Sequence, residues 1–197
     1  MGSSVSSDDY VPSKKSAALH TLCKQGSGVE LATSRFNPFG NFPGAPWAYH
    51  TSILMNGAEY SFADDGVTRG RSLASHDMFP DQPEVTHCGI TLATEREMLA
   101  ALRPHFKMQT YDLLRKNCSS FTDCALFFLI GARLDPCYHG LEQVGAAWDR
   151  NIGLVQSLTR GEYRPNPLAD GFSVKNVIAE LEKNHTFVCL RKGLRIE

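Results

Sequence analysis

Apolar residues follow two different spacings along the chain, which indicates a mixture of strands and helices. The clearest strand signal lies in residues 47–63, where two strand-like runs flank the dipeptide Asn56-Gly57. This dipeptide is the strongest short-range signal for a two-residue β-hairpin turn. The turn predicts four antiparallel pairs: Met55 with Ala58, Leu54 with Glu59, Ser52 with Ser61, and His50 with Ala63.

Two further short strands are predicted, one at residues 16–23 and one at residues 87–93. A loop rich in Gly, Pro and Asn, residues 26–46, is predicted to be irregular. A second, polar loop is predicted over residues 71–85, between the hairpin and the last strand.

Helical spacing dominates the second half of the chain. Thr94 with Glu97 three residues later is a capping-box pattern, and Pro104 is expected to end the helix that follows. Phe121, Ala125, Phe128 and Leu129 follow helical spacing, and Gly131 marks the end of that helix. A glycine-interrupted helix is predicted at 140–158 and an amphipathic helix at 173–184. Because helices and strands mix without βαβ regularity, the predicted fold class is α+β.

Composition bounds the organisation of the chain. The 197 residues are 42% hydrophobic and 21% charged, which fits one globular domain. We expect a disordered tail at 1–15, a domain at 16–159, and a C-terminal extension at 160–197. The formal net charge of -1 argues against binding to nucleic acid or anionic membranes through bulk charge.

The N-terminus lacks the basic and apolar regions of a secretory signal, and the apolar run 124–132 is too short to span a bilayer. We therefore expect reduced thiols and a location in the cytoplasm, with the nucleus as a second expected compartment. The pairs His20/Cys23 and His87/Cys88 lack a second clustered pair, so neither a metal nor an organic cofactor is predicted.

Cys118 is predicted at the point where a loop becomes a helix, with Asn117 or Ser119 available as the cap. Unpaired N–H groups and the dipole of a helix N-terminus stabilise a thiolate, and the same groups can bind an oxyanion. The simpler interpretation is that Cys118 is a small buried residue. Cys124 lies among apolar neighbours and is interpreted as a core residue.

His50 is the histidine with the most predictable frame, because the hairpin register fixes its neighbours. Ser61 and Asp65 are its predicted diagonal neighbours on the same face, and either could orient the imidazole. The alternative is a half-buried strand histidine with a satisfied ring. His76 and His87 flank the second loop and are weaker candidates for a base.

These two sites together resemble the PPPDE family of thiol peptidases, also called desumoylating isopeptidases. The first block reads WAYHTSILMNGAEYSFADDG and the second reads YDLLRKNCSSFTDCALFFLIGARL. The resemblance covers residues 17–145 and implies a circularly permuted papain-like fold, with a short antiparallel sheet and the catalytic cysteine at a helix N-terminus. Papain itself has the cysteine before the histidine, whereas the order here is histidine first. The resemblance implies that His50 is the base and Cys118 the nucleophile.

By the same resemblance, the substrate is an isopeptide bond to ubiquitin or a ubiquitin-like modifier such as SUMO. The N–H of Cys118 and the side chain of Asn117 are the expected oxyanion donors, and loop 26–46 is the expected wall of a groove. The chain departs from the family pattern at Ser119, where Asn is usual, and after residue 160 no counterpart is identified. A protein S-acyl thioesterase with the same dyad and a non-catalytic binding module on the same fold are the alternatives.

The first residues, MGSSVS, fit the N-myristoylation pattern with Gly2 as acceptor. An ordinary polar tail is the alternative. Because one acyl chain gives only marginal, reversible binding, we expect at most a weak membrane association.

Overall fold

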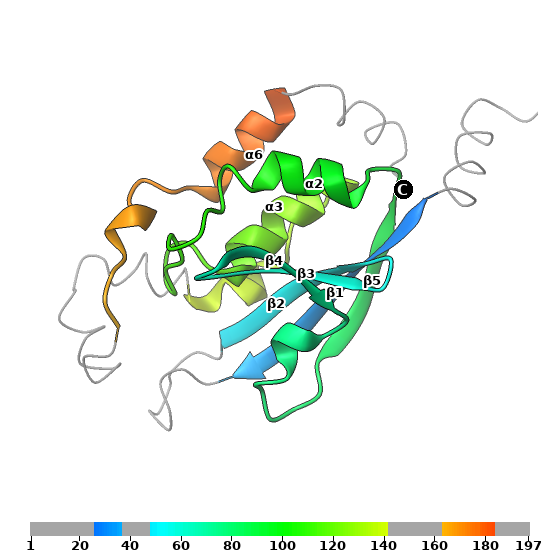
Figure 1. Cartoon of the computed structure of the whole chain (residues 1–197), viewed down its shortest axis with the longest axis horizontal. Helices are drawn as coiled ribbons and strands as arrows, with labels where there is room; N and C mark the ends of the chain where they lie inside the picture. The colour runs from blue at the N-terminus through cyan, green and yellow to red at the C-terminus, as the bar shows by residue number, and fades with distance from the viewer. Residues whose placement is uncertain (1–25, 37–47, 142–162, 184–197) are drawn as a thin grey trace, which may run out of the picture.

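The computed structural model describes residues 26–36, 48–141 and 163–183. In this part of the chain, five strands form one mixed α/β unit with three α-helices and three short 3-10 turns (Figure 1). The strands are β1 (Ser27–Phe36), β2 (Ala48–Met55), β3 (Ala58–Ala63), β4 (Gly66–Arg71) and β5 (Glu84–Thr91). The helices are α2 (Glu95–Leu102), α3 (Cys118–Ile130) and α6 (Val174–Lys183), and the 3-10 turns are η1 (Ala74–His76), η2 (Pro136–His139) and η3 (Pro167–Ala169).

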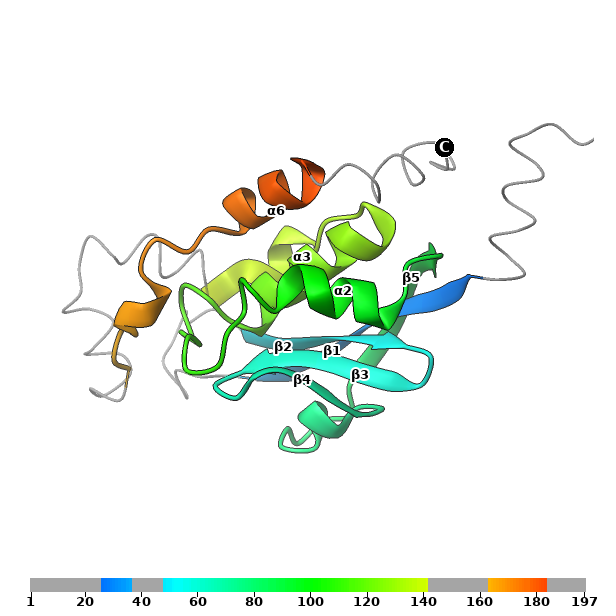
Figure 2. The same cartoon turned by 45° about the horizontal axis from the view of Figure 1, so that its top comes forward.

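The strands form one sheet in the order β4-β3-β2-β1-β5, and every neighbouring pair is antiparallel. Helices α2 and α3 cover one face of the sheet, α6 lies on their outer side, and the turn η1 lies on the opposite face (Figure 2). The main hydrophobic core fills the space between the sheet and these helices, with Tyr60, Phe62, Phe106 and Phe121 among its fully buried side chains.

The predicted hairpin is present, but its ladder holds only the last residues of β2. Asn56 and Gly57 both have positive φ, and the pairs Met55–Ala58 and Leu54–Glu59 are confirmed. The β2–β3 ladder extends only to Ile53–Tyr60, whereas β1 pairs with β2 as far as Phe36–Ala48. The first half of β2 is therefore held mainly by β1, and the β2–β3 ladder does not reach it.

The prediction of an irregular loop over residues 26–46 was wrong in its first part, because residues 27–36 form β1. This strand lies between β2 and β5, and its Val29, Leu31 and Ala32 are buried. The prediction gave more weight to the Gly and Pro residues after residue 36 than to the apolar residues of 29–32. The burial of these apolar residues depends on the two neighbouring strands, which no local pattern reveals. The predicted polar loop 71–85 also contains η1 and the first residues of β5.

The predicted helix starts are confirmed at two positions. Thr94 caps α2 with a complete capping box to Glu97, and Asn117 caps α3 with a capping box to Ser120. Gly131 ends α3 with φ 69, and the amphipathic helix predicted at 173–184 is α6. Val177, Ile178 and Leu181 form the buried stripe of α6, which packs against α3.

Several sequence predictions lie outside the described residues: the tail with Gly2, the strand at 16–23, residues 37–46 of the loop, and nearly all of the helix at 140–158.

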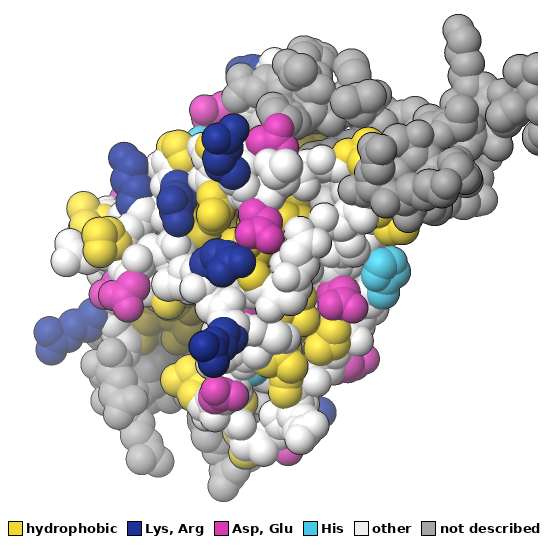
Figure 3. Space-filling view, turned by 45° about the vertical axis from the view of Figure 1, so that its right-hand side comes forward, with side chains coloured by type: hydrophobic (Ala, Val, Ile, Leu, Met, Phe, Trp, Pro, Cys, Tyr) yellow, Lys and Arg dark blue, Asp and Glu magenta, His cyan; other side chains and the backbone are white. Residues whose placement is uncertain are grey.

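On the face shown in Figure 3, basic side chains alternate with acidic and apolar ones. Within the described ranges, none of the helices has the length and apolar character needed to cross a membrane.

Candidate active site

A pocket of about 180 Å³ opens where β2 begins and α3 begins. Both Cys118 and His50 line it, so the structure brings the two predicted site residues to one cavity. The remaining wall is largely apolar and aromatic, and it is made by Phe36, Tyr49, Phe62, Ala63, Met78, Phe79, Tyr111, Leu113, Asn117, Ser119, Tyr138 and Leu141. Phe36 is thus the described part of the predicted loop wall.

Cys118 is the first residue of α3, directly after the cap. It is 5% exposed, and its Sγ lies 3.9 Å from the carbonyl oxygen of Tyr49 in β2. The start of α3 is tied to the sheet, because the Thr51 hydroxyl donates to Thr122 at 3.0 Å and also reaches Ser119. The thiol therefore lies at the positive end of a helix that is fixed against β2.

Tyr111 is the second group that contacts Cys118. It lines the same pocket as Cys118, and its hydroxyl interacts with the thiol and the backbone of that residue. Burial raises the pKa of Tyr111 far above its usual value, and the proximity of the Cys118 thiol raises it further. The phenol is therefore neutral at physiological pH and keeps a proton that it can donate inside the pocket.

His50 is held by a hydrogen bond at one ring nitrogen and by contacts with two neighbouring rings. Its Nε2 lies 2.7 Å from the Ser75 hydroxyl, and its ring stacks on Phe79 with centroids 5.3 Å apart. Burial lowers the pKa of His50 from 6.5 to about 4; His76 adds to this shift, and Glu59 opposes it. The imidazole is therefore neutral at physiological pH, which is the form that can accept a proton.

His76 packs beside His50, with ring centroids 4.7 Å apart. It is buried, and its Nδ1 and Nε2 lie 2.8 Å and 2.9 Å from the hydroxyls of Ser34 and Ser52. Its Nε2 also lies 3.4 Å from the Glu59 carboxylate. Because burial lowers the pKa of His76 as well, this contact is one between a carboxylate and a neutral ring at physiological pH.

The residues predicted to orient His50 have other positions. The Ser61 hydroxyl lies 3.0 Å from the hydroxyl of Thr68, and Asp65 is an exposed residue of the turn between β3 and β4. Since the β2–β3 ladder stops at Ile53–Tyr60, His50 lies beyond it, and the diagonal pairing assumed for Ser61 and Asp65 does not extend that far. The described side chain that hydrogen-bonds His50 is Ser75, from the turn on the other face of the sheet.

Asn117 has a structural role at the start of α3. Its side-chain oxygen accepts from the N–H of Ser120 at 3.0 Å, and its amide donates to the carbonyl of Leu113 at 2.9 Å. One amide hydrogen remains after these bonds, so oxyanion binding by Asn117 stays a prediction.

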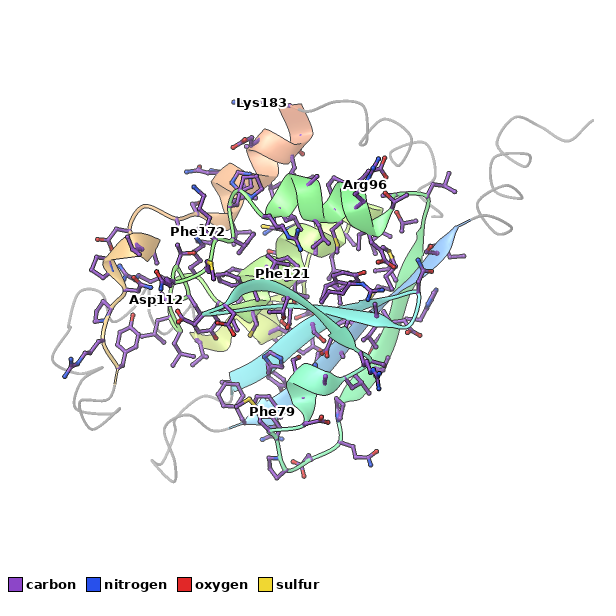
Figure 4. All side chains as sticks on the ribbon, in the orientation of Figure 1. Phe79, Arg96, Asp112, Phe121, Phe172 and Lys183 are labelled. Carbon is purple, nitrogen blue, oxygen red and sulfur yellow. The ribbon has the colours of Figure 1, made fainter. Side chains whose placement is uncertain are left out.

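The loop that leads to Cys118 is fastened by the buried carboxylate of Asp112. This carboxylate accepts from the N–H groups of Leu114 and Arg115, and Arg115 also binds it through its guanidinium at 2.8 Å. Tyr163 and the N–H of Asn166 donate to the same carboxylate. Figure 4 shows Asp112 between this loop and the segment that carries these two residues. Residues 163–170, which the sequence left without a role, thus brace the loop before Cys118.

Lys116 adds a second brace two residues before Cys118. Its ammonium donates to the Thr110 hydroxyl at 2.7 Å and lies 4.9 Å from the ring centroid of Phe172. It lies within 6 Å of the rings of Phe62 and Phe106 as well. Burial lowers the pKa of Lys116. The ammonium is enclosed by aromatic rings and serves as an anchor for the loop.

Sequence reasoning missed four residues around this pocket: Tyr111, Ser75, Glu59 and Phe79. Tyr111 had a signal, because it opens the second sequence block that ends in Asn117-Cys118. The hairpin register paired Glu59 with Leu54, but no local pattern connects it with Ser75. In the described ranges, no three His, Cys, Asp or Glu side chains cluster in a way that could hold a metal ion.

Comparison with known proteins identifies the class. Residues 18–147 match the model of the PPPDE putative peptidase domain, and the chain therefore belongs to this family. A curated relative is desumoylating isopeptidase 1 of Xenopus laevis, which is 31% identical over 94 residues. The match covers 46% of this chain and 54% of the relative, so the chain spans about half the length of that protein. The family is thus one of putative peptidases, and the relative is by its name an isopeptidase.

Proposed function

We propose that this protein is a thiol isopeptidase that uses Cys118 as nucleophile and His50 as general base. One observation carries the proposal: a thiol at a helix N-terminus and a neutral imidazole line the same pocket. The helix end favours the thiolate, and the neutral ring can take up its proton. We include in this proposal that the fold is a circularly permuted papain-like one. The order of the two residues, histidine before cysteine, supports it.

The proposed reaction has two halves. In the first, the Cys118 sulfur forms a bond to the carbonyl carbon of the isopeptide, and the thiol proton passes to His50. The carbon–nitrogen bond then breaks, and His50 returns the proton to the leaving lysine amine. In the second half, His50 takes a proton from water, the resulting hydroxide attacks the thioester, and the sulfur leaves with that proton.

The developing oxyanion needs donors at the pocket end of α3. The N–H of Cys118 is the first candidate, with Asn117 and the neutral hydroxyl of Tyr111 beside it. In apolar surroundings such donors act more strongly than they do in water, and one of them is worth about 3 kcal/mol of transition-state stabilisation.

For the substrate, we propose conjugates of ubiquitin or a ubiquitin-like protein. The name of the Xenopus laevis relative supports a SUMO-type modifier, and a pocket of about 180 Å³ has room for a tail that ends in small residues. No cofactor has a role in this scheme. We further propose that the protein acts in the cytoplasm, with the nucleus as a second compartment.

A second candidate activity is removal of acyl groups from protein cysteines by the same dyad. The observation that favours it is the apolar lining of the pocket, to which Phe36, Met78, Phe79, Leu113 and Leu141 contribute. An acyl chain gains about 0.8 kcal/mol for each CH₂ group that such a surface buries.

Labelling with three probes separates these activities. Ubiquitin and SUMO that carry a C-terminal electrophile report isopeptidase specificity, and a lipid thioester reports acyl removal. We expect covalent capture of Cys118 by a modifier probe and none in Cys118→Ala. Turnover of the lipid thioester alone would favour the thioesterase, and no reaction with any probe would favour a binding module.

A further inference from the structure

Ser75 and Glu59 form a buried hydrogen-bonded chain that ends on His50. The Ser75 hydroxyl donates to Glu59 Oε1 at 2.6 Å, and its backbone N–H donates to Glu59 Oε2 at 2.9 Å. The same hydroxyl oxygen lies 2.7 Å from His50 Nε2. Glu59 is 2% exposed and comes from β3, whereas Ser75 comes from η1.

The direction of these bonds fixes the position of the proton on His50. An ionised carboxylate has no hydrogen to donate, so Ser75 must give its single hydroxyl hydrogen to Glu59. Its oxygen can then only accept from His50, which places a hydrogen on Nε2. In a neutral imidazole the other nitrogen, Nδ1, consequently carries the lone pair that can take up a proton.

The burial of Glu59 indicates that this chain has more than a packing role. A buried carboxylate is costly unless its hydrogen bonds are satisfied, and here two come from a single residue of a short 3-10 turn. That turn contacts β3 and β4 on the face opposite α3, so it holds Ser75 against His50. The Phe79 ring stacked on His50 limits rotation of the imidazole.

We propose that Ser75 and Glu59 are positioning residues for His50: Ser75 links the Glu59 carboxylate to Nε2 and leaves Nδ1 as the basic nitrogen. The inference rests on the proposed function. The sequence predicted that Ser61 or Asp65 orients the imidazole. The proposal assigns this role to Ser75 of η1 and Glu59 of β3 instead.

The test compares Ser75→Ala, Ser75→Thr and Glu59→Gln with Ser34→Ala as the matched control. Ser34→Ala removes a serine hydroxyl that lies 2.8 Å from a histidine ring nitrogen, but that ring is His76. Nitrogen-15 NMR of the imidazoles, assigned with His50→Gln, needs no substrate. We expect a slowly exchanging proton on His50 Nε2 in the wild type and in Ser34→Ala, and rapid exchange of this proton in Ser75→Ala.

Kinetics with the modifier probe or substrate supply the second readout. Ser75→Ala is expected to lower kcat at least about tenfold with little change in KM, since general-base catalysis contributes about 10²–10⁴-fold in total. Ser75→Thr keeps the hydroxyl and should recover most of this loss. Because the charge of Glu59 raises the pKa of His50, Glu59→Gln should move the acidic limb of the rate profile to lower pH.

Three results would overturn the proposal: a proton on Nδ1 rather than Nε2 in the wild type, unchanged kcat in Ser75→Ala, or equal loss in Ser34→Ala. A wild-type protein that cleaves no probe would instead refute the proposed function. In that case the NMR measurement still decides whether the chain sets the proton on His50.

Discussion

The pKa of His50 leads to a sharp prediction for activity at low pH. Burial is the largest cause of the shift to about 4, and the ring of His76 is the second. With a pKa of 4, roughly 90% of the imidazole is neutral at pH 5, whereas with the ordinary 6.5 only about 3% is. If neutral His50 is the base, the protein should therefore keep most of its kcat/KM at pH 5, about 30-fold more than an unshifted histidine would permit.

The measurement is kcat/KM for a fluorogenic modifier conjugate between pH 3.5 and 8. We expect the acidic limb to be centred near pH 4. In His76→Gln the limb should move toward higher pH, because one of the groups that lower the pKa of His50 is removed. An acidic limb centred near 6.5 in a protein that is still folded by circular dichroism would refute the reasoning.

The same shift has a consequence for stability, which sets a lower limit on the usable pH. The native state binds the His50 proton less readily than the unfolded state does, so protonation favours unfolding. The contribution is complete above pH 6.5 and is lost as pH falls toward 4. The shift of 2.5 units, from 6.5 to about 4, corresponds to at most about 3 kcal/mol, with His76 acting in the same direction. Urea unfolding at pH 7 and pH 4.5 should show this loss, and His50→Gln should reduce it.

Two further predictions concern the nucleophile and its loop. Cys118→Ala should abolish hydrolysis and leave the fold intact, since it removes one sulfur at the start of α3. Iodoacetamide should label Cys118 before Cys124, which is fully buried. Equal labelling of the two thiols or an active alanine variant would contradict the assignment of the nucleophile. Asp112→Asn should lower the free energy of unfolding by about 3 kcal/mol, because it weakens a buried ion pair with Arg115 and a bond from Tyr163. Urea denaturation measures this change, and a loss below about 0.5 kcal/mol would show that residues 163–170 do not brace the loop.

Local sequence signals were sufficient for the elements whose chemistry lies within a few residues. The Asn56-Gly57 turn set its own register, and Thr94 with Glu97 marked the first residue of α2. Asn117 and Ser119 were both possible caps for α3, and this predicted start, where Asn117 is the cap, is why Cys118 could be assigned to a helix N-terminus. In the turn the positive φ of Asn56 and Gly57 selects the conformation, and at the two helix starts short-range capping hydrogen bonds do so.

Strand β1 shows where local signals were insufficient. Its sequence is partly polar, yet Thr33 and Ser34 are buried because β2 and β5 flank the strand. The local sequence pattern shows the nearby Gly and Pro residues, but it does not show that two other strands pair with this segment. The boundary of the loop was consequently placed about ten residues too early.

The surroundings of His50 depend on contacts between elements that are distant in the sequence. Ser75 is 25 residues from His50, and it becomes a partner only when η1 packs against the face that carries Glu59. The hairpin register placed Glu59 on that face, but a glutamate in a strand ordinarily points to solvent. Its burial becomes favourable only with two donors from Ser75, and these donors come from a loop whose sequence is merely polar. The residues proposed here to be reactive could therefore be predicted from the sequence, whereas the group proposed to direct the imidazole follows from the tertiary packing of a buried carboxylate.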